Sequence, residues 1–301
     1  MEILPVTCLV PAADSLGEGC MWDQKGACLW WLDIARPSRV HRLDPATGSH
    51  RMWQTSLTVT AMAMRQAGGL ILAGEDGLYL FDPMTGAISP FARPETDRPN
   101  NRFNDGACDP QGRFWIGSMH QNIGPKGEDL PIPADTGALY AVDGKGASVK
   151  WEDKVGVSNG PCWSPDGRTF YFSDSKNQVT YAYDFDGAAG RISNRRVLND
   201  SKDYGYPDGA TVDAEGFIWS ARWEGACVLR IDPKGRIARV IAMPAERPTC
   251  VCFGGPNLDT MYVTSSRAHL DQASMARYPL QGGLFCFHPG VRGTPKFTFA
   301  G

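Results

Sequence analysis

A phrase of about 50 residues recurs six times along this 301-residue chain, and that recurrence constrains the fold more than any other feature. Each copy has a turn with Gly, a run of β-branched or aromatic residues, a short break, a second such run and a polar turn. Clear copies include QKGACLWWLDI with RVHRLDPATG (24–48), AGGLILAGEDGLYLFDPMTG (67–86) and PDGRTFYFSDSKNQVTYAYDFDG (165–187). Others begin at PQGRFWIGSM and AEGFIWSARW, and a degenerate sixth begins at GPNLDTMYVTSS.

Short strands with turns between them and almost no helical periodicity predict a closed radial array. We therefore expect an all-β fold, a six-bladed β-propeller with four-stranded blades around a central channel, as a single domain over 1–301. A β-sandwich is the main competitor, but it does not explain a repeat. The best helix candidate, Ser266–Tyr278, is predicted to be an irregular loop. The recurring Asp-Pro pairs at blade ends are predicted to be structural turns, namely Asp44-Pro45, Asp82-Pro83 and Asp232-Pro233.

The composition excludes several function classes. The net charge of -3 argues against nucleic acid and anionic membranes as partners, because both need a basic patch. No apolar run approaches 18 residues, and the N-terminal MEILPVTCLVP lacks the features of a secretory signal. The nine scattered cysteines are expected to be reduced. These features predict a cytoplasmic protein, a monomer or a small homo-oligomer.

Four polar side chains share one position in the repeat. Counting back eight residues from the turn glycine of four copies gives a carboxylate or carboxamide each time, at Glu18, Asn104, Asn159 and Asp208. The second and sixth copies have Thr60 and Thr249 there. We expect this position just before the first, innermost strand of each blade, so the four side chains should converge at one end of the channel.

An Asn-Gly or Asp-Gly pair by itself is typical of a turn. Four such residues in one register, together with Glu18-Gly19, favour a common site instead. The set offers oxygen ligands and no thiol or imidazole, which favours a hard or borderline divalent cation over a structural zinc site.

Several words of the sequence resemble the senescence-marker-protein/gluconolactonase family, which includes regucalcin and bacterial aldonolactonases. They occur in the family's order over nearly the whole chain: Gly17-Glu18-Gly19, Arg102-Phe103-Asn104-Asp105-Gly106, Ser158-Asn159-Gly160, Pro207-Asp208-Gly209, and CFGG at Cys252–Gly255. The resemblance implies that Glu18, Asn159 and Asp208 hold one divalent ion. It also implies that Arg102 and Asn104 bind substrate.

One segment departs from the family's pattern. Regucalcin-like members carry an acidic residue shortly after the GTM or GSM element, where it contacts the sugar. Here Gly117-Ser118-Met119 is followed by His120-Gln121-Asn122. His120 and Asn122 can still form hydrogen bonds with hydroxyls, so we expect them to bind substrate with a different preference. Taken alone, His120 could equally be a solvent-facing loop residue.

The resemblance and the residue types together predict metal-dependent hydrolysis of a sugar-acid lactone in sugar catabolism. Zn, Ca, Mn and Fe(II) all suit three oxygen ligands and waters. Asp208 is expected to be the general base, because a carboxylate beside the ion can reach the attacking water. The alternatives are a metal-dependent hydrolase of other esters or phosphotriesters, and a non-enzymatic calcium-binding propeller. No G-x-S-x-G, H-E-x-x-H or phosphate-binding loop suggests other chemistry.

Overall fold

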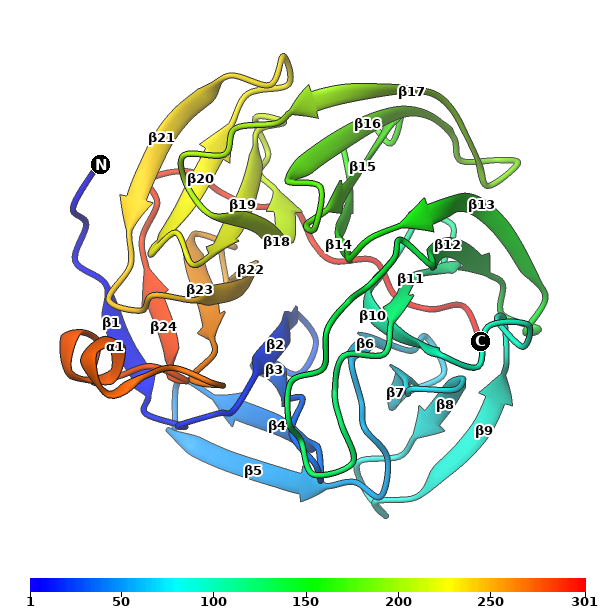
Figure 1. Ribbon diagram of the computed structural model, residues 1–301, viewed down its shortest axis with the longest axis horizontal. Helices are drawn as coiled ribbons and strands as arrows, with labels where there is room; N and C mark the ends of the chain where they lie inside the picture. Colours follow the sequence, from blue (N-terminus) through cyan, green and yellow to red (C-terminus); the bar gives the residue numbers. More distant parts are fainter.

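A computed structural model describes residues 1–301 and contains six four-stranded antiparallel sheets arranged in a ring (Figure 1). The predicted six-bladed β-propeller is therefore confirmed. From the channel outward, the first blade consists of β2 (Gly17–Asp23), β3 (Cys28–Asp33), β4 (Arg39–Asp44) and β5 (Ser49–Gln54). The second consists of β6 (Ala61–Met64), β7 (Leu70–Ala73), β8 (Leu78–Phe81) and β9 (Ile88–Ala92). The third consists of β10 (Asn101–Cys108), β11 (Phe114–His120), β12 (Gly137–Val142) and β13 (Ser148–Val155).

The fourth and fifth blades follow the same order. They consist of β14 (Ser158–Trp163), β15 (Thr169–Asp174), β16 (Val179–Asp186) and β17 (Arg191–Asn199), then β18 (Tyr206–Val212), β19 (Ile218–Trp223), β20 (Cys227–Ile231) and β21 (Ile237–Ala242). The sixth blade takes its outermost strand from the start of the chain. It consists of β22 (Pro248–Gly254), β23 (Thr260–Ser265), β24 (Leu284–Phe287) and β1 (Thr7–Val10), with Thr7 paired to Cys286.

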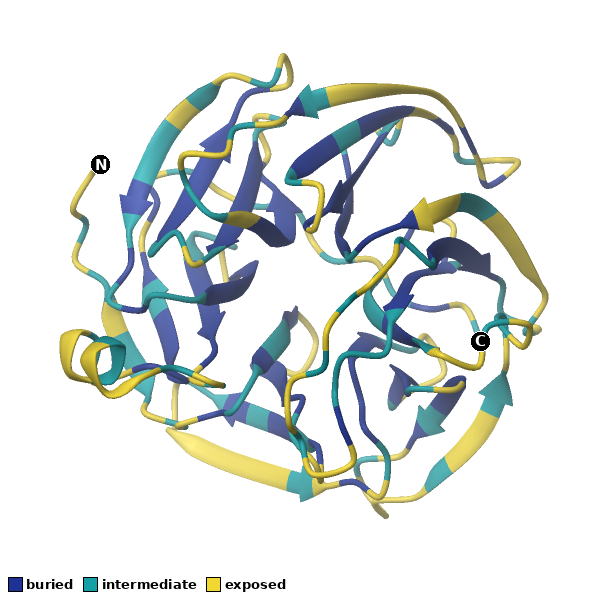
Figure 2. Ribbon diagram, viewed as in Figure 1, coloured by how far each residue is buried: buried dark blue, intermediate teal, exposed yellow.

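Burial falls from the channel toward the rim (Figure 2). The second strand of the first blade, CLWWLD, is buried at every residue, whereas the outermost strand, SHRMWQ, is exposed at five of six. A strand buried on both faces accounts for the apolar runs seen in the sequence. The exposed outer strands carry charged residues, as in RISNRRVLN of β17, and such edges resist pairing with other chains.

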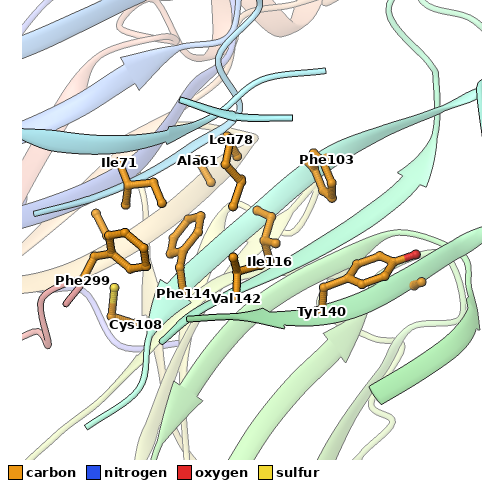
Figure 3. Packing of buried hydrophobic residues seen from close by; sticks show 13 residues of the cluster. Ala61, Ile71, Leu78, Phe103, Cys108, Phe114, Ile116, Tyr140, Val142 and Phe299 are labelled. Carbon is orange, nitrogen blue, oxygen red and sulfur yellow. The ribbon is translucent and has the colours of Figure 1, made fainter. Parts of the chain in front are cut away.

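The core lies mainly between neighbouring blades. In the cluster of Figure 3, Ala61, Ile71 and Leu78 of the second blade pack with Phe103 and other apolar residues of the third. The aromatic ring of Phe299, near the end of the chain, completes this cluster. Each blade therefore buries its apolar faces only in the presence of its neighbours.

One difference from the predicted secondary structure lies in a loop. Within Ser266–Tyr278, expected to be an irregular loop, Gln272–Arg277 forms the short helix α1. The carboxylate of Asp271 caps this helix, accepting a hydrogen bond from the Ser274 N–H at 2.7 Å. The helix buries none of its residues, so no apolar stripe signals it in the sequence. No helix of the chain has the length and apolar character needed to cross a membrane.

The Asp-Pro turns are structural, and the cysteines form no disulfides. Asp44, Asp82 and Asp232 each accept a hydrogen bond from a backbone N–H two residues later, at 2.8–2.9 Å, so the Asp-Pro turns are structural as predicted. All nine cysteines are unbridged.

Candidate metal and substrate site in the channel

Glu18, Asn104, Asn159 and Asp208 lie within the innermost strands β2, β10, β14 and β18. The prediction that they lie just before those strands was therefore wrong. In each blade the pairing with the second strand shifts register at or directly after this residue. Such β-bulges redirect side chains, which is how residues inside a strand reach the channel. Gly19 and Gly160, next to two of the four, have φ of 58° and 60°, values that glycine adopts without strain.

Hydrogen bonds join two of the four residues, Asn104 and Asn159, and extend to the backbone next to a third, Asp208. The Asn104 Nδ2 donates to Asn159 Oδ1 at 3.0 Å and to the Ser158 carbonyl at 2.8 Å. Asn159 Nδ2 in turn donates to Ser175 Oγ at 2.8 Å, and that hydroxyl donates to the carbonyl of Pro207. Because Pro207 directly precedes Asp208, this chain of hydrogen bonds fixes the third, fourth and fifth blades relative to one another at the site.

The carboxylates of Glu18 and Asp208 are close enough to interact electrostatically. Burial raises the pKa of Glu18 well above its usual range, and the charges of Asp208 and Asp105 raise it further. Burial is likewise the largest cause that raises the pKa of Asp208, and the charge of Asp105 is the next largest. Each accepts one hydrogen bond from the next residue's N–H, Gly19 or Gly209, at 3.0 and 3.1 Å. Neither has an ion-pair partner within 4.0 Å.

Asp105 is a third carboxylate of the channel that the sequence interpretation missed. Its two oxygens accept the N–H groups of Gly106 and Gly160 at 2.7 and 2.8 Å, and its pKa is raised by burial. The signal was present in the word Asn104-Asp105-Gly106, where only the first residue was assigned. Consecutive strand residues normally point to opposite faces, but the bulge here allows both side chains to serve the channel.

The other end of the hydrogen-bond network is built around Arg102. This residue is only 3% exposed. Its Nη1 donates to Asn104 Oδ1 at 2.6 Å, while Nε and Nη2 both donate to Asn122 Oδ1, at 3.0 and 2.7 Å. Asn122 lies in the segment between β11 and β12, which crosses the front of the channel in Figure 1. The structure thus brings Arg102, Asn104 and Asn122 together.

His120 is placed differently. It is the last residue of β11, paired in the ladder with Asn101, and its Nδ1 is buried without a hydrogen-bond partner. No hydrogen bond joins it to Arg102, Asn104 or Asn122. The assignment of His120 to substrate binding stays a prediction.

A cavity of about 70 Å³ lies along the inner strands beyond Gly19. The C-terminal segment Thr294–Phe297 contributes to its wall, and Asp105 and Lys296 both line it. Four of its other lining residues are thiols, from Cys20, Cys108, Cys162 and Cys250. The cavity has mainly apolar and thiol walls, so the polar chemistry is concentrated around Asn104, Asn159 and the carboxylates.

The donor set suits a divalent cation. The carboxylates of half-buried Glu18 and buried Asp208 repel each other and form no ion pair, although the charges of Arg102 and Arg222 act on them at longer range. A bound ion would lower both pKa values. Asn159 adds a neutral carboxamide oxygen. The chain has no cluster of three or more His, Cys, Asp and Glu side chains that could hold a metal. The predicted ligand set contains only two residues of these types, Glu18 and Asp208, because its third member, Asn159, binds through an amide oxygen. Glu18, Asn159 and Asp208 could therefore hold a hard cation.

Comparisons with known proteins identify the family. The family model described as SMP-30/Gluconolactonase/LRE-like region matches residues 16–267. Regucalcin of Xenopus laevis is 36% identical over 304 residues, which cover 100% of each chain. The 6-deoxy-6-sulfogluconolactonase of Pseudomonas putida is 36% identical over 296 residues, which cover 98% of each chain. The solved structure of a calcium-binding protein, regucalcin, from Agrobacterium tumefaciens superposes with a TM-score of 0.90 at 31% identity, covering 99% of this chain and 98% of the other. The chain belongs to the SMP-30/gluconolactonase/LRE-like family.

Proposed function

We propose that this protein hydrolyses the lactone of a sugar acid to the open acid, using one divalent ion held by Glu18, Asn159 and Asp208. The observation that carries the proposal is the pair of neighbouring carboxylates, half-buried Glu18 and buried Asp208, which repel each other and form no ion pair. They share a hydrogen-bonded channel with Arg102, Asn104 and Asn122, which can bind hydroxyl groups. Membership of a gluconolactonase-containing family, and a relative named for a sulfo-substituted gluconolactone, support the same reaction.

The chemistry divides between the ion and the side chains. A bound divalent ion would act as a Lewis acid toward the lactone carbonyl. Asp208 is the general base: it accepts a proton from water as the water oxygen forms a bond to the carbonyl carbon. The bond from that carbon to the ring oxygen then breaks, and the proton passes from Asp208 to the ring oxygen, which leaves as a hydroxyl. Asp208 accepts only one hydrogen bond within the protein, from the Gly209 N–H, so it keeps acceptor positions for the proton of water.

The remaining residues bind and orient the sugar. Arg102 and Asn104 are held by each other and by Asn122 and Asn159, so their positions are set before substrate arrives. Such preorganisation reduces the entropy cost of orienting the substrate. His120, at the end of β11, is assigned to the outer part of the substrate site. We infer a role in sugar catabolism from the substrate class.

A hydrolysis screen tests the proposal. Metal-stripped protein is offered aldonolactones in a weakly buffered pH-indicator assay, with Zn, Ca, Mn or Fe(II) added back singly. We expect acid release with at least one lactone, dependent on one of the ions. Phenyl acetate and a phosphotriester serve as controls for general esterase activity. Hydrolysis of these compounds without hydrolysis of any lactone would contradict the proposal, as would lactone hydrolysis that needs no ion.

A further inference from the structure

Arg102 is a buried cation without a carboxylate partner. Its side chain has five N–H donors. Four have acceptors, and all of these are neutral: Asn122 Oδ1 twice, Asn104 Oδ1 and the Phe103 carbonyl. No carboxylate lies within 4.0 Å of it. A buried guanidinium usually pairs with an anion, since desolvation of the charge is costly.

Glu75, Glu18 and Asp129 act on Arg102 at longer range, but none of them forms an ion pair with it. Glu75 forms an ion pair with Arg36 and also accepts a hydrogen bond from Gln121 Nε2 at 2.7 Å. Its negative charge is therefore already matched by a second arginine. Burial lowers the pKa of Arg102 to about 10 despite the charges of Glu75 and Glu18, while Arg36 lowers it further. The guanidinium remains charged at neutral pH and forms no ion pair within the protein.

Asn122 completes a set of donors around the free side of Arg102. One oxygen of Asn122 accepts from both Nε and Nη2, so the amide is oriented by the guanidinium. The Asn122 Nδ2 has no hydrogen-bond partner within the protein. One N–H of Arg102 and the amide of Asn122 are thus available, and both can only donate. A ligand group that only accepts, and carries negative charge, complements this arrangement.

We propose that the substrate is a sugar lactone carrying an anionic substituent, a carboxylate, sulfonate or phosphate, which Arg102 and the Asn122 amide bind in the channel. This inference rests on the proposed lactonase function and narrows its substrate class. Asn122 is the specificity-determining residue: it orients the guanidinium without neutralising it. A carboxylate at this position would itself pair with Arg102 and repel the substituent.

The first test compares matched substrates. D-Glucono-1,5-lactone is compared with its counterparts that carry a carboxylate, sulfonate or phosphate at carbon 6. We expect kcat/KM to be at least tenfold higher for one or more of the anionic lactones, and the best of them identifies the substituent. Equal or better hydrolysis of the neutral lactone would overturn the inference and leave the proposed function standing.

The second test changes one charge at constant shape. Asn122→Asp should reduce the preference for the anionic lactone at least tenfold, because the new carboxylate pairs with Arg102. Asn257→Asp is the matched control: it adds the same charge at an exposed turn between β22 and β23, and should keep the preference. An unchanged preference in Asn122→Asp, or an equal loss in Asn257→Asp, would contradict the assignment of Asn122.

A third measurement does not depend on hydrolysis. Methyl β-D-glucuronide and methyl β-D-glucoside differ only in a carboxylate, and neither is a lactone. Calorimetry should show tighter binding of the glucuronide to the wild type and no such difference in Asn122→Asp. If no lactone is hydrolysed, the proposed function fails, and this comparison still decides whether Arg102 forms an anion site. Equal binding of the two glycosides to the wild type would overturn it.

Discussion

Burial determines what the carboxylates of the channel can do. Glu18, Asp105 and Asp208 all have raised pKa values, and burial is the largest cause in each case. The structure nevertheless gives them different partners. Asp105 accepts a backbone N–H on each of its two oxygens, from Gly106 and Gly160, whereas Glu18 and Asp208 each accept only one backbone hydrogen bond. Asp105 therefore has a mainly structural role, and the other two retain oxygen atoms for an ion or a proton.

Asp208→Asn tests the assignment of the base. The amide keeps an oxygen for the Gly209 N–H and for an ion, so fold and metal binding should persist. Loss of a general base usually lowers turnover by about 10²–10⁴-fold, and we expect kcat to fall by at least about 10². Steady-state kinetics at saturating metal measures this. Turnover close to that of the wild type would assign the base to another group, with Glu18 the next candidate.

Glu18→Gln separates metal binding from substrate binding. It removes one of two anionic ligands, so metal affinity, measured by calorimetry on stripped protein, should fall, and activity should partly return at high metal concentration. Arg102→Ala leaves all three ligands in place. It should lower kcat/KM by an amount equivalent to about 2–3 kcal/mol of lost transition-state stabilisation, as expected for a lost charge-assisted contact. Added metal should not restore this activity. The same response to metal in both variants would refute these separate roles.

At the scale of one blade, the first blade contains a buried polar cluster that lies outside the channel. Asp14 Oδ2 accepts a hydrogen bond from Trp31 Nε1 at 2.9 Å, and His41 Nδ1 lies 3.0 Å from His50 Nε2. Burial, followed by the charge of Asp33, raises the pKa of Asp14 to about 7. Burial lowers the pKa of His41 to about 3, and the charges of His50 and Arg39 act in the same direction. Near pH 5 this cluster is therefore neutral at Asp14 and His41.

The raised pKa of Asp14 gives the blade a pH-dependent stability. An unfolded Asp loses its proton near pH 4, whereas folded Asp14 keeps it to about pH 7. The contribution of Asp14 to the free energy of unfolding is thus largest below pH 4, declines as the pH rises to 7 and stays constant above pH 7. Asp14→Asn should abolish this decline, which is worth about 2–4 kcal/mol. Urea titrations of both proteins at pH 5 and pH 8 measure it; an equal pH dependence in the two would contradict the assigned pKa.

The blades were predictable from sequence because their signals are local. A turn glycine and a run such as CLWWLD specify a strand without reference to the rest of the chain. The register of Glu18, Asn159 and Asp208 followed from the same repeat. The bulges were not predictable, because they depend on pairing with the second strand, and so Asp105 was missed. The contact of Glu75 with Arg36 and Gln121 joins three blades, and no local pattern encodes it.

At the scale of the whole molecule, the ring is closed by its first strand. β1 pairs with β24. Glu2 forms two backbone hydrogen bonds with β21: its N–H donates to the Val240 carbonyl at 2.6 Å, and its carbonyl accepts from the Ala242 N–H at 3.0 Å. Leu4, Val6 and Cys8 pack against the cluster between the fifth and sixth blades. The first ten residues thus connect the fifth blade to the sixth, in which the ring closes.

Deleting residues 1–10 should therefore weaken the entire propeller. A loss of a few kcal/mol in a chain of this size corresponds to a fall in Tm of about 5–10 °C. If the chain is one domain, scanning calorimetry should show a single transition that moves as a whole. Glu2→Ala, which removes only the ion pair with Arg239, should shift Tm much less. Two separate transitions, with only one affected by the deletion, would refute the single-domain prediction.

The closure also sets an order of events during synthesis on the ribosome. Thr7 is translated long before Cys286, yet the two residues pair with each other. At about 5–20 residues per second, β1 waits roughly 15 s to a minute for its partner strand. Through that interval the nascent chain presents an unpaired strand to other polypeptides. A truncated product that lacks β24 never closes, so ring closure distinguishes chains translated through β24 from shorter ones.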